Sequence, residues 1–226
     1  MTERESRSAR PVLRRGDRWT SAAPFPTHMG RMADQLALFE SAEKSAVPDI
    51  DGLRFVAEAI APLQADCLAA LVDQSPLTPF QFGPWEGKRL TANYGSAYDY
   101  QRGKPTSAPP ALPWLIELCA QVAPQFGRDP ACFSQALVTR YDPGAGIGWH
   151  SDRPQYAEVI GLSLGAPATM RLRRRRADGG FERANLRLPS RSIYLLSNTV
   201  RWEWEHSIAP LSETRRSITF RSLRDA

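Results

Sequence analysis

The chain has 226 residues, of which 42% are hydrophobic and 23% charged, and its net charge at pH 7 is +5. This length allows one well-buried core and is short for two domains, and the composition is that of a globular chain, not a disordered or fibrous one. No apolar run approaches the ~18 residues of a membrane-spanning helix, so we expect no membrane partner. The positive charge favours a polyanionic partner.

The beginning of the chain lacks the pattern of a packed element. Residues 1–34 mix Arg, Ser, Pro and Glu without an apolar period, which predicts a disordered arm ahead of a folded domain over residues 35–226. Because this arm has no apolar stretch of the secretory type, we expect a cytoplasmic protein; an organellar transit peptide is the alternative. Cys67, Cys119 and Cys132 form no Cys-x-x-Cys pair, which argues against a thiolate zinc site and predicts small core residues.

Two helices are predicted in the first half of the domain. Residues 52–56 predict a strand, and residues 61–73 a helix with Pro in its first turn. Residues 76–104 are rich in Pro, Gly and aromatic residues, and the run RLTANYGSAYDYQRG predicts a hairpin or an exposed aromatic loop. A second helix is predicted over residues 112–123. Its apolar face would carry Leu115, Leu118, Cys119 and Val122.

From about residue 135 onward the apolar pattern changes to a period of two. Short apolar runs are separated by turn signals: ALVTRY, EVIGLSL, ATMRLRR, ANLRL, SIYLLS, EWEHSI and RSITFR. This spacing predicts about eight strands of an antiparallel architecture. The whole pattern predicts an α+β, mainly β fold, a jelly-roll or double-stranded β-helix with N-terminal helices packed on one sheet.

The stretch GIGWHSD contains a candidate metal-binding pair. His150 and Asp152 are two residues apart, so in a strand both side chains point to the same face. A mononuclear iron site of the facial type needs two imidazoles and one carboxylate on one side of the metal. His206, in WEHSI, is the other histidine of the predicted domain. For either histidine alone, an ordinary core or surface role is the more frequent alternative.

Two arginines in TRRSITFRSL add an anion-binding pattern. Arg215 and Arg221 are six residues apart and share a strand face, where they could present two cations to a small dicarboxylate that chelates the metal. The alternative is a solvated basic edge strand. Ile218 and Phe220 alternate with polar residues, which leaves open which face of the strand is wet.

The motifs TRYDPGAGIGWHSD, VIGLSLGAPATMRLR, WEHSI and RRSITFR, in this order, resemble those of the AlkB family of iron(II)- and 2-oxoglutarate-dependent dioxygenases. The resemblance covers residues 91–223 and implies Fe(II) as cofactor with 2-oxoglutarate and O2 as cosubstrates. Thr139 and Ser217 stand where many relatives have Asn, although both retain a hydroxyl. The implied iron ligands are His150, Asp152 and His206, and the implied cosubstrate partners are Tyr141, Arg215 and Arg221.

The resemblance also implies a reaction and a substrate. The reaction would be oxidative demethylation of N-alkylated nucleobases in DNA or RNA, coupled to decarboxylation of 2-oxoglutarate to succinate and CO2, with release of formaldehyde. The nucleobase-recognising lid would be residues 76–104, with Tyr94, Tyr98 and Tyr100 as candidate contacts; packing of a loop onto the sheet is their alternative role. Phosphate contacts, or else a solvated hairpin, are expected of Arg171, Arg173, Arg174, Arg175 and Arg176.

Two other functions stay open at this point. One is an oxygenase that acts on modified tRNA, a protein side chain or a small molecule, because function belongs to the site and lid and not to the fold. The other is a non-catalytic nucleic-acid-binding jelly-roll with a structural metal, against which the complete set of ligands and arginines argues. Nothing in the sequence requires more than a monomer.

Overall fold

The computed structural model describes residues 47–82, 84–99 and 104–224, all within the compact unit Ser45–Ala226. The predicted arm, residues 1–34, lies outside the described residues. The helices are α2 (Pro62–Gln74), α3 (Pro113–Val122) and α4 (Asn198–Trp202). The strands are β1 (Leu53–Val56), β2 (Thr78–Phe82), β3 (Trp85–Tyr94), β4 (Ser96–Asp99), β5 (Lys104–Ser107), β6 (Phe133–Tyr141), β7 (Ile147–His150), β8 (Tyr156–Gly165), β9 (Ala168–Arg175), β10 (Phe181–Leu188), β11 (Ile193–Leu196), β12 (Trp204–Ile208) and β13 (Arg215–Leu223).

The two predicted helices form within one residue of their expected bounds. Both α2 and α3 begin with a proline, which is favourable at the first helical position because the N–H it lacks has no partner there. The four residues predicted for the apolar face of α3 are all buried. The prediction that the cysteines are core residues holds for Cys119 and is wrong for Cys67 and Cys132, whose side chains are exposed.

All the described strands except β4 and β5 form the two sheets of a jelly-roll, which confirms the predicted fold class. The larger sheet has the order β1-β11-β8-β13-β6-β3-β2, and the smaller sheet has the order β10-β9-β12-β7. β6 to β13 supply the eight strands expected from the alternating runs. Strands from the first half of the domain extend the larger sheet, which the sequence did not predict. The hairpin expected within RLTANYGSAYDYQRG is also placed differently, because β3 continues through Tyr94 and β4 pairs with β5.

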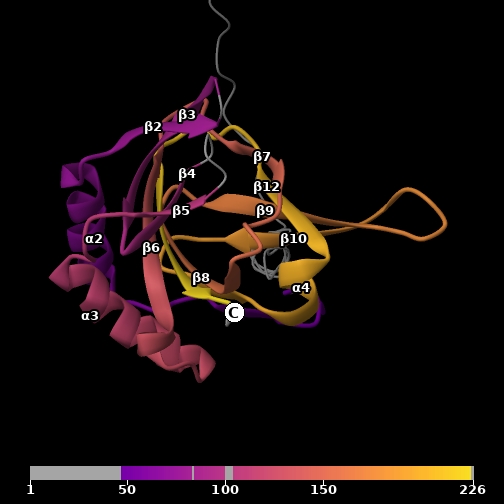
Figure 1. Ribbon diagram of the computed structural model, residues 1–226, viewed down its shortest axis with the longest axis horizontal. Helices are drawn as coiled ribbons and strands as arrows, with labels where there is room; N and C mark the ends of the chain where they lie inside the picture. Colours follow the sequence, from indigo (N-terminus) through magenta and orange to yellow (C-terminus); the bar gives the residue numbers. More distant parts are fainter. Residues whose placement is uncertain (1–46, 83, 100–103, 225–226) are drawn as a thin grey trace, which may run out of the picture. The chain divides into compact units, whose positions relative to one another are not determined.

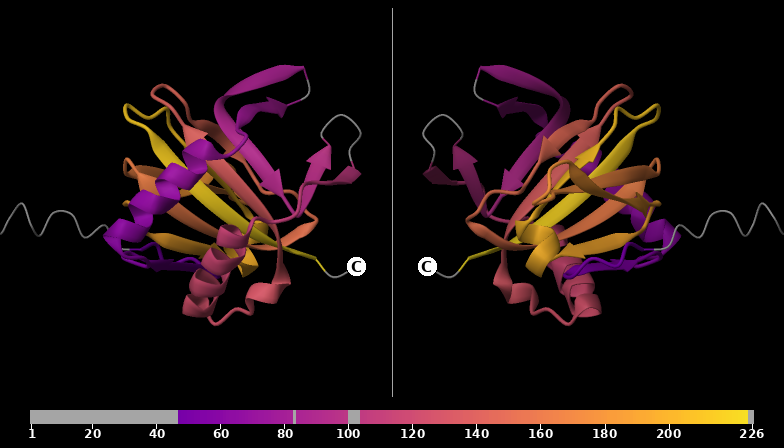
Figure 2. Two further views of the ribbon diagram at one scale, coloured as in Figure 1. Left: turned by 90° about the vertical axis from the view of Figure 1, so that its left-hand side faces the viewer. Right: turned by 90° about the vertical axis from the view of Figure 1, so that its right-hand side faces the viewer.

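Helices α2 and α3 cover one face of the larger sheet (Figures 1 and 2). The alternation along β13 explains how this sheet has two different faces. Ile218 and Phe220 are buried in the core that the helices share with the sheet. Arg215 and Arg221, with the opposite parity, line a pocket on the other face. Neither face of β13 is therefore an open surface: one face packs in the core, and the two arginines on the other face line the pocket.

A second apolar core fills part of the space between the two sheets. It combines Met170 and Leu172 of β9 with Tyr194 of β11 and Trp204 of β12. These side chains hold the smaller sheet over the inner face of the larger one, and the pocket lies beside them. Among the described residues, no helix is long and apolar enough to cross a membrane. The expected cytoplasmic location and monomeric state stay predictions.

Candidate active site

A pocket of about 680 Å³ lies between the sheets, with β3, β6 and β13 on one side and β7 and β12 on the other. Polar residues at alternating positions of the larger sheet face into it. On β13 these residues are Arg215, Ser217, Thr219 and Arg221, and on β6 they include Gln135, Thr139 and Tyr141. A sheet face with so many polar side chains cannot be a simple core, because each buried polar group needs a hydrogen-bond partner.

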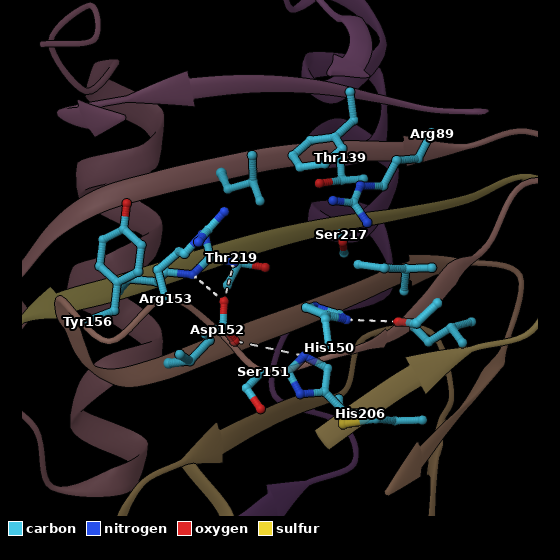
Figure 3. A pocket seen from close by; sticks show the side chains of 18 of the residues that line it. Arg89, Thr139, His150, Ser151, Asp152, Arg153, Tyr156, His206, Ser217 and Thr219 are labelled. Atoms are coloured by element: carbon cyan, nitrogen blue, oxygen red, sulfur yellow. Dashed lines mark hydrogen bonds and ion pairs between the residues drawn. The ribbon is translucent and has the colours of Figure 1, made fainter. Parts of the chain in front are cut away.

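The three predicted metal ligands meet at this pocket (Figure 3). His150 ends β7 and lies directly opposite His206 of β12 in the antiparallel register, and the centroids of the two imidazole rings are 4.3 Å apart. Asp152 follows β7, and its Oδ2 lies 3.8 Å from Nε2 of His206. Residues separated by more than fifty positions are thus brought together by strand pairing.

Both imidazoles are held in the neutral form that binds metals. Burial lowers the pKa of His206 to about 3, and burial also lowers the pKa of His150. Nδ1 of His150 lies 2.9 Å from the carbonyl oxygen of Gly148. A carbonyl can only accept, so Nδ1 carries the proton and Nε2 keeps a free lone pair, which is the usual arrangement of a metal-binding histidine.

Asp152 is held as a carboxylate by Arg221. Burial alone would raise the pKa of Asp152, but the charge of the adjacent Arg221 guanidinium is the largest effect that opposes burial, and the pKa lies below its usual value. Nε and Nη2 of Arg221 lie 2.9 and 2.8 Å from Oδ1 of Asp152. Nη1 of Arg221 donates to Gln135 at 3.0 Å, and Gln135 in turn donates to Asn93 of β3 at 3.0 Å. Arg221 is therefore already engaged by the candidate ligand.

Arg215 has the opposite character, since its guanidinium is buried without an anion. The residue is 1% exposed, its Nε donates to Oγ of Ser163 at 3.0 Å, and Nη1 has no hydrogen-bond partner among the described residues. Its cation lies 5.2 Å from the ring centroid of Tyr141, its neighbour on β6. An unpaired buried guanidinium destabilises the fold, so this position is suited to an arriving carboxylate.

The residues fit a mononuclear ferrous ion with a dicarboxylate beside it by residue type and charge. Within the described ranges, no three His, Cys, Asp or Glu side chains have their donor atoms already gathered around one point. Asp152 directs one oxygen at Arg221 and the other toward His206. Because the two histidine backbones are paired, we expect side-chain rotation to bring the donors together.

The loop that follows Asp152 is fixed by a buried arginine that sequence analysis missed. Arg201 of α4 is 3% exposed, and its Nη2 donates to the carbonyl oxygens of Arg153 and Tyr156 at 2.7 and 2.6 Å. α4 itself was not predicted, because its five residues are too few to show a helical period. The helix matters here because it holds the chain on the C-terminal side of Asp152.

The lid prediction is corrected for Tyr94. This residue is 3% exposed and belongs to the core under the helices, so it does not face the pocket. Tyr98 lies on β4 and its side chain is not described, whereas Tyr100 lies outside the described residues. Instead, the β2–β3 hairpin contributes Phe80 and Arg89 to the pocket, with the guanidinium carbon 3.9 Å from the ring centroid. We call these two residues the rim pair.

The arginines of MRLRRRR do not share one face. Arg174 pairs with Glu182 and Glu203 at 2.8 and 2.9 Å and is thereby neutralised. Arg171 and Arg173 lie instead over the ring of Trp149. Strand parity therefore separates the run, which a prediction from the run as a whole did not consider.

Tyr194 packs so closely on Gly161 that we expect a large effect from adding one methyl group at Gly161. Its ring lies on Gly161 of the neighbouring strand, where an added Cβ would overlap the ring, and burial raises the pKa of Tyr194 to about 12, so the phenol stays protonated. We expect Gly161→Ala to displace this ring from the pocket, to lower the free energy of unfolding by about 1–3 kcal/mol, and to weaken 2-oxoglutarate binding. Thermal unfolding and calorimetric titration measure both effects.

Gly148→Ala is the matched control for stability, because a Cβ there meets nothing within 4 Å. Wild-type stability and cosubstrate affinity in Gly161→Ala would contradict the placement of Tyr194.

Comparison with known proteins defines the class of protein. Residues 81–224 match the sequence model of the 2OG-Fe(II) oxygenase superfamily. The chain belongs to this superfamily, so it is an oxygenase whose cofactor is Fe(II) and whose cosubstrates are 2-oxoglutarate and O2.

Individual relatives confirm the resemblance to the AlkB family. The chain is 26% identical over 172 residues to the tRNA (carboxymethyluridine(34)-5-O)-methyltransferase alkbh8 of Xenopus tropicalis, a match that covers 70% of this chain and 25% of that protein. It is 34% identical over 102 residues to the uncharacterized protein L905 of Acanthamoeba polyphaga mimivirus, covering 39% of this chain and 48% of that one. The chain thus spans half or less of these relatives.

Solved structures support the fold. The structure of OsALKBH1 superposes with a TM-score of 0.57 at 16% identity and covers 78% of this chain and 99% of its own. A prolyl-4-hydroxylase from Pseudomonas putida superposes with a TM-score of 0.52 at 14% identity and covers 77% of this chain and 94% of its own. At such low identity these similarities concern the fold alone.

Proposed function

We propose that this oxygenase removes methyl groups from N-alkylated nucleobases in DNA, with RNA as a second nucleic-acid substrate. The observation that carries the proposal is the pocket itself, in which the three candidate ligands, the unpaired cation of Arg215 and the rim pair line one space. A flat ring beside a guanidinium suits a planar base, which stacks on aromatic and arginine side chains. The net charge of +5 supports a polyanionic substrate.

We assign the following roles to the pocket residues. His150, Asp152 and His206 hold the iron, and Arg221 orients Asp152 through a hydrogen bond from Nε and an ion pair from Nη2. Arg215 binds the far carboxylate of 2-oxoglutarate, for which its free Nη1 is available. Tyr141, beside Arg215 in the register, donates its hydroxyl to the cosubstrate.

The overall reaction balances with the cosubstrates of the superfamily. When bound, iron, 2-oxoglutarate and O2 supply the oxidising chemistry: one oxygen atom enters succinate as CO2 leaves, and the other enters a C–H bond of the N-methyl group. The N-hydroxymethyl product then loses formaldehyde and leaves an N–H. The protein orients the base and excludes water.

The base must leave the helix stack to reach the candidate ligands. A base within a duplex cannot enter a pocket between two sheets, so the substrate is single-stranded or has its base flipped out, at a cost of about a few kcal/mol. We place the rim pair beside the flipped base, and Tyr98 and Tyr100 of the lid remain candidate contacts.

A modified tRNA is the second candidate substrate. The frog relative is named for action on tRNA, and the basic charge of this chain suits any polyanion. The prolyl-4-hydroxylase with the same fold makes a protein side chain the third candidate. These substrates share the iron chemistry and differ in what enters the pocket, so the product identifies the substrate.

The decisive experiment reconstitutes the protein anaerobically with Fe(II) and 2-oxoglutarate and then admits O2 with a methylated single-stranded DNA oligomer. We expect loss of the methyl group by mass spectrometry together with an equal amount of succinate. Succinate without demethylation would assign another substrate, and a methylated tRNA is then the next one to test. Neither product, from protein shown to hold iron, would contradict the enzymatic roles that we assign to the pocket residues.

A further inference from the structure

The outer face of the smaller sheet is rich in arginine, and the pocket chemistry does not use it. Every second residue of β9 and β10 points away from the core between the sheets. Met170 and Leu172 are buried in that core, whereas the residues between them point outward. We call the outward set the arginine face, which consists of Arg171, Arg173, Arg175, Arg183 and Arg187.

Within the described residues of the smaller sheet, the acidic side chains do not balance the positive charge of the arginine face. Among the described residues of β7, β9, β10 and β12, Glu205 is the only acidic side chain with outward parity, and its Oε2 lies 2.6 Å from Nε of Arg173. Arg183 lies directly opposite Arg173 in the register. Like charges opposite each other on neighbouring strands destabilise a sheet, and an anionic ligand would remove this repulsion.

Aromatic rings orient the guanidinium groups of this face. The guanidinium carbon of Arg173 lies 4.3 Å from the ring centroid of Trp149 and 4.5 Å from that of Phe181. Arg175 lies 5.2 Å from the centroid of Phe181. A guanidinium stacked on a ring keeps N–H groups at its edge, in the planar fork that matches a phosphate. Nε of Arg171 donates to Oγ of Ser207 at 3.0 Å and Nε of Arg173 to Glu205, so it is the outer N–H groups of these stacked cations that face a ligand.

The arginine face includes a hollow and continues to the pocket. The hollow, of about 320 Å³, is lined by Thr169, Arg171, Asn185 and Arg187, among others. Its hydrogen-bond donors suit one phosphate group. Trp149, which carries the stacked arginines, also lines the pocket and precedes His150. A ligand that extends from the pocket past Trp149 would therefore reach the arginine face.

We infer that the arginine face binds the phosphate backbone of a single-stranded nucleic acid while the target base occupies the pocket. The inference rests on the proposed function, because it takes a nucleic acid as the substrate. Rows of cations beside aromatic rings are typical of proteins that follow a single strand. An anionic membrane is the less suitable polyanion, because membrane-surface elements present free apolar side chains, whereas Trp149 and Phe181 lie under guanidinium groups.

The double variant Arg183→Gln, Arg187→Gln tests this inference. Replacing Arg183 removes the charge repulsion with Arg173, which lies opposite it. The replacement also removes the contact of the Arg183 guanidinium with the ring of Phe181, whose centroid is 5.5 Å away. Because the first effect stabilises the sheet, we expect the variant to fold. The control Arg128→Gln, Arg224→Gln removes the same charge away from the smaller sheet. Binding of fluorescein-labelled oligothymidylate is measured by anisotropy at several salt concentrations, and turnover is measured on a methylated trinucleotide and on a long methylated oligomer.

The two results of this experiment are distinct. We expect the arginine-face variant to bind oligothymidylate about tenfold more weakly at low salt, with a salt slope shallower by about 1.4, that is ~0.7 for each of two phosphate contacts. Turnover of the trinucleotide should not change, while turnover of the long oligomer falls at limiting substrate. The control variant should bind as the wild type does.

If the arginine-face variant and the wild type have equal affinity for oligothymidylate and an equal salt slope, the arginine face does not bind the phosphate backbone. The proposed function would not be affected by this result. If the wild type binds no nucleic acid, both the inference about the arginine face and the proposed nucleic-acid substrate are wrong. Both are also wrong if the wild type binds phosphatidylserine vesicles and does not bind oligothymidylate.

Discussion

Replacement of His150 by alanine should abolish 2-oxoglutarate turnover while the domain still folds. Within the described part of the chain, the hydrogen bond that this side chain would lose is the one to the carbonyl of Gly148. The substitution therefore removes one of the two imidazoles of the candidate site at a modest structural cost, with a small shift of the melting temperature. Turnover should fall by at least about a hundredfold, because the metal ligand itself is lost. Succinate formation and Fe(II) binding are the measurements.

Asp152→Ala is the informative companion to this variant. It too should stop turnover, but it also leaves Arg221 buried without its anion, which destabilises a protein by about 3–5 kcal/mol. The two variants should therefore have the same catalytic defect and different unfolding curves. Succinate formation near the wild-type rate in either variant would show that the ligand is wrongly assigned.

Replacement of Arg215 by alanine should raise the dissociation constant of 2-oxoglutarate by about a hundredfold. Two hydrogen bonds from a cation to a carboxylate contribute about 3 kcal/mol together. Of the two predicted arginines, Arg215 has the free buried nitrogen, since Arg221 is occupied by Asp152 and Gln135. Calorimetric titration of 2-oxoglutarate into anaerobic Fe(II)-loaded protein measures the change, and the maximal rate at saturating cosubstrate should change much less.

Arg216→Ala provides the matched control for Arg215. Arg216 is the next residue of β13 and points to the opposite face, where its Nε donates to Asp73 of α2 at 2.8 Å. This variant should lose some stability and keep its affinity for 2-oxoglutarate. Arg215→Lys should lie between the wild type and the alanine variant, because lysine keeps the charge but lacks the planar fork. Unchanged affinity in Arg215→Ala would remove this residue from the cosubstrate site.

The sequence alone predicted helices α2 and α3, most strands after residue 135 and the candidate ligands. Strand alternation around Ile218 and Phe220 located β13, and the apolar face of α3 was predicted residue by residue. The pairs His150 with Asp152 and Arg215 with Arg221 were predicted to share faces because side-chain direction in a strand repeats every two residues. This periodicity holds for Arg215 and Arg221 within β13, whereas Asp152 lies beyond the end of β7 at His150 and reaches the pocket from the following loop.

Only the tertiary structure decided which groups meet. Arg221 and Asp152 are 69 positions apart and pair through a contact between β13 of the larger sheet and the loop that follows β7 of the smaller sheet, and no local pattern encodes that contact. The contact between Phe80 and Arg89 at the pocket also depends on strand pairing. Tyr94 was predicted to lie at the pocket instead, but in β3 its side chain points toward the core under the helices. The sequence by itself determined which side chains point in the same direction along each strand; strand pairing determined what each one faces, since partners, burial and charge neutralisation depend on residues that are distant in the chain.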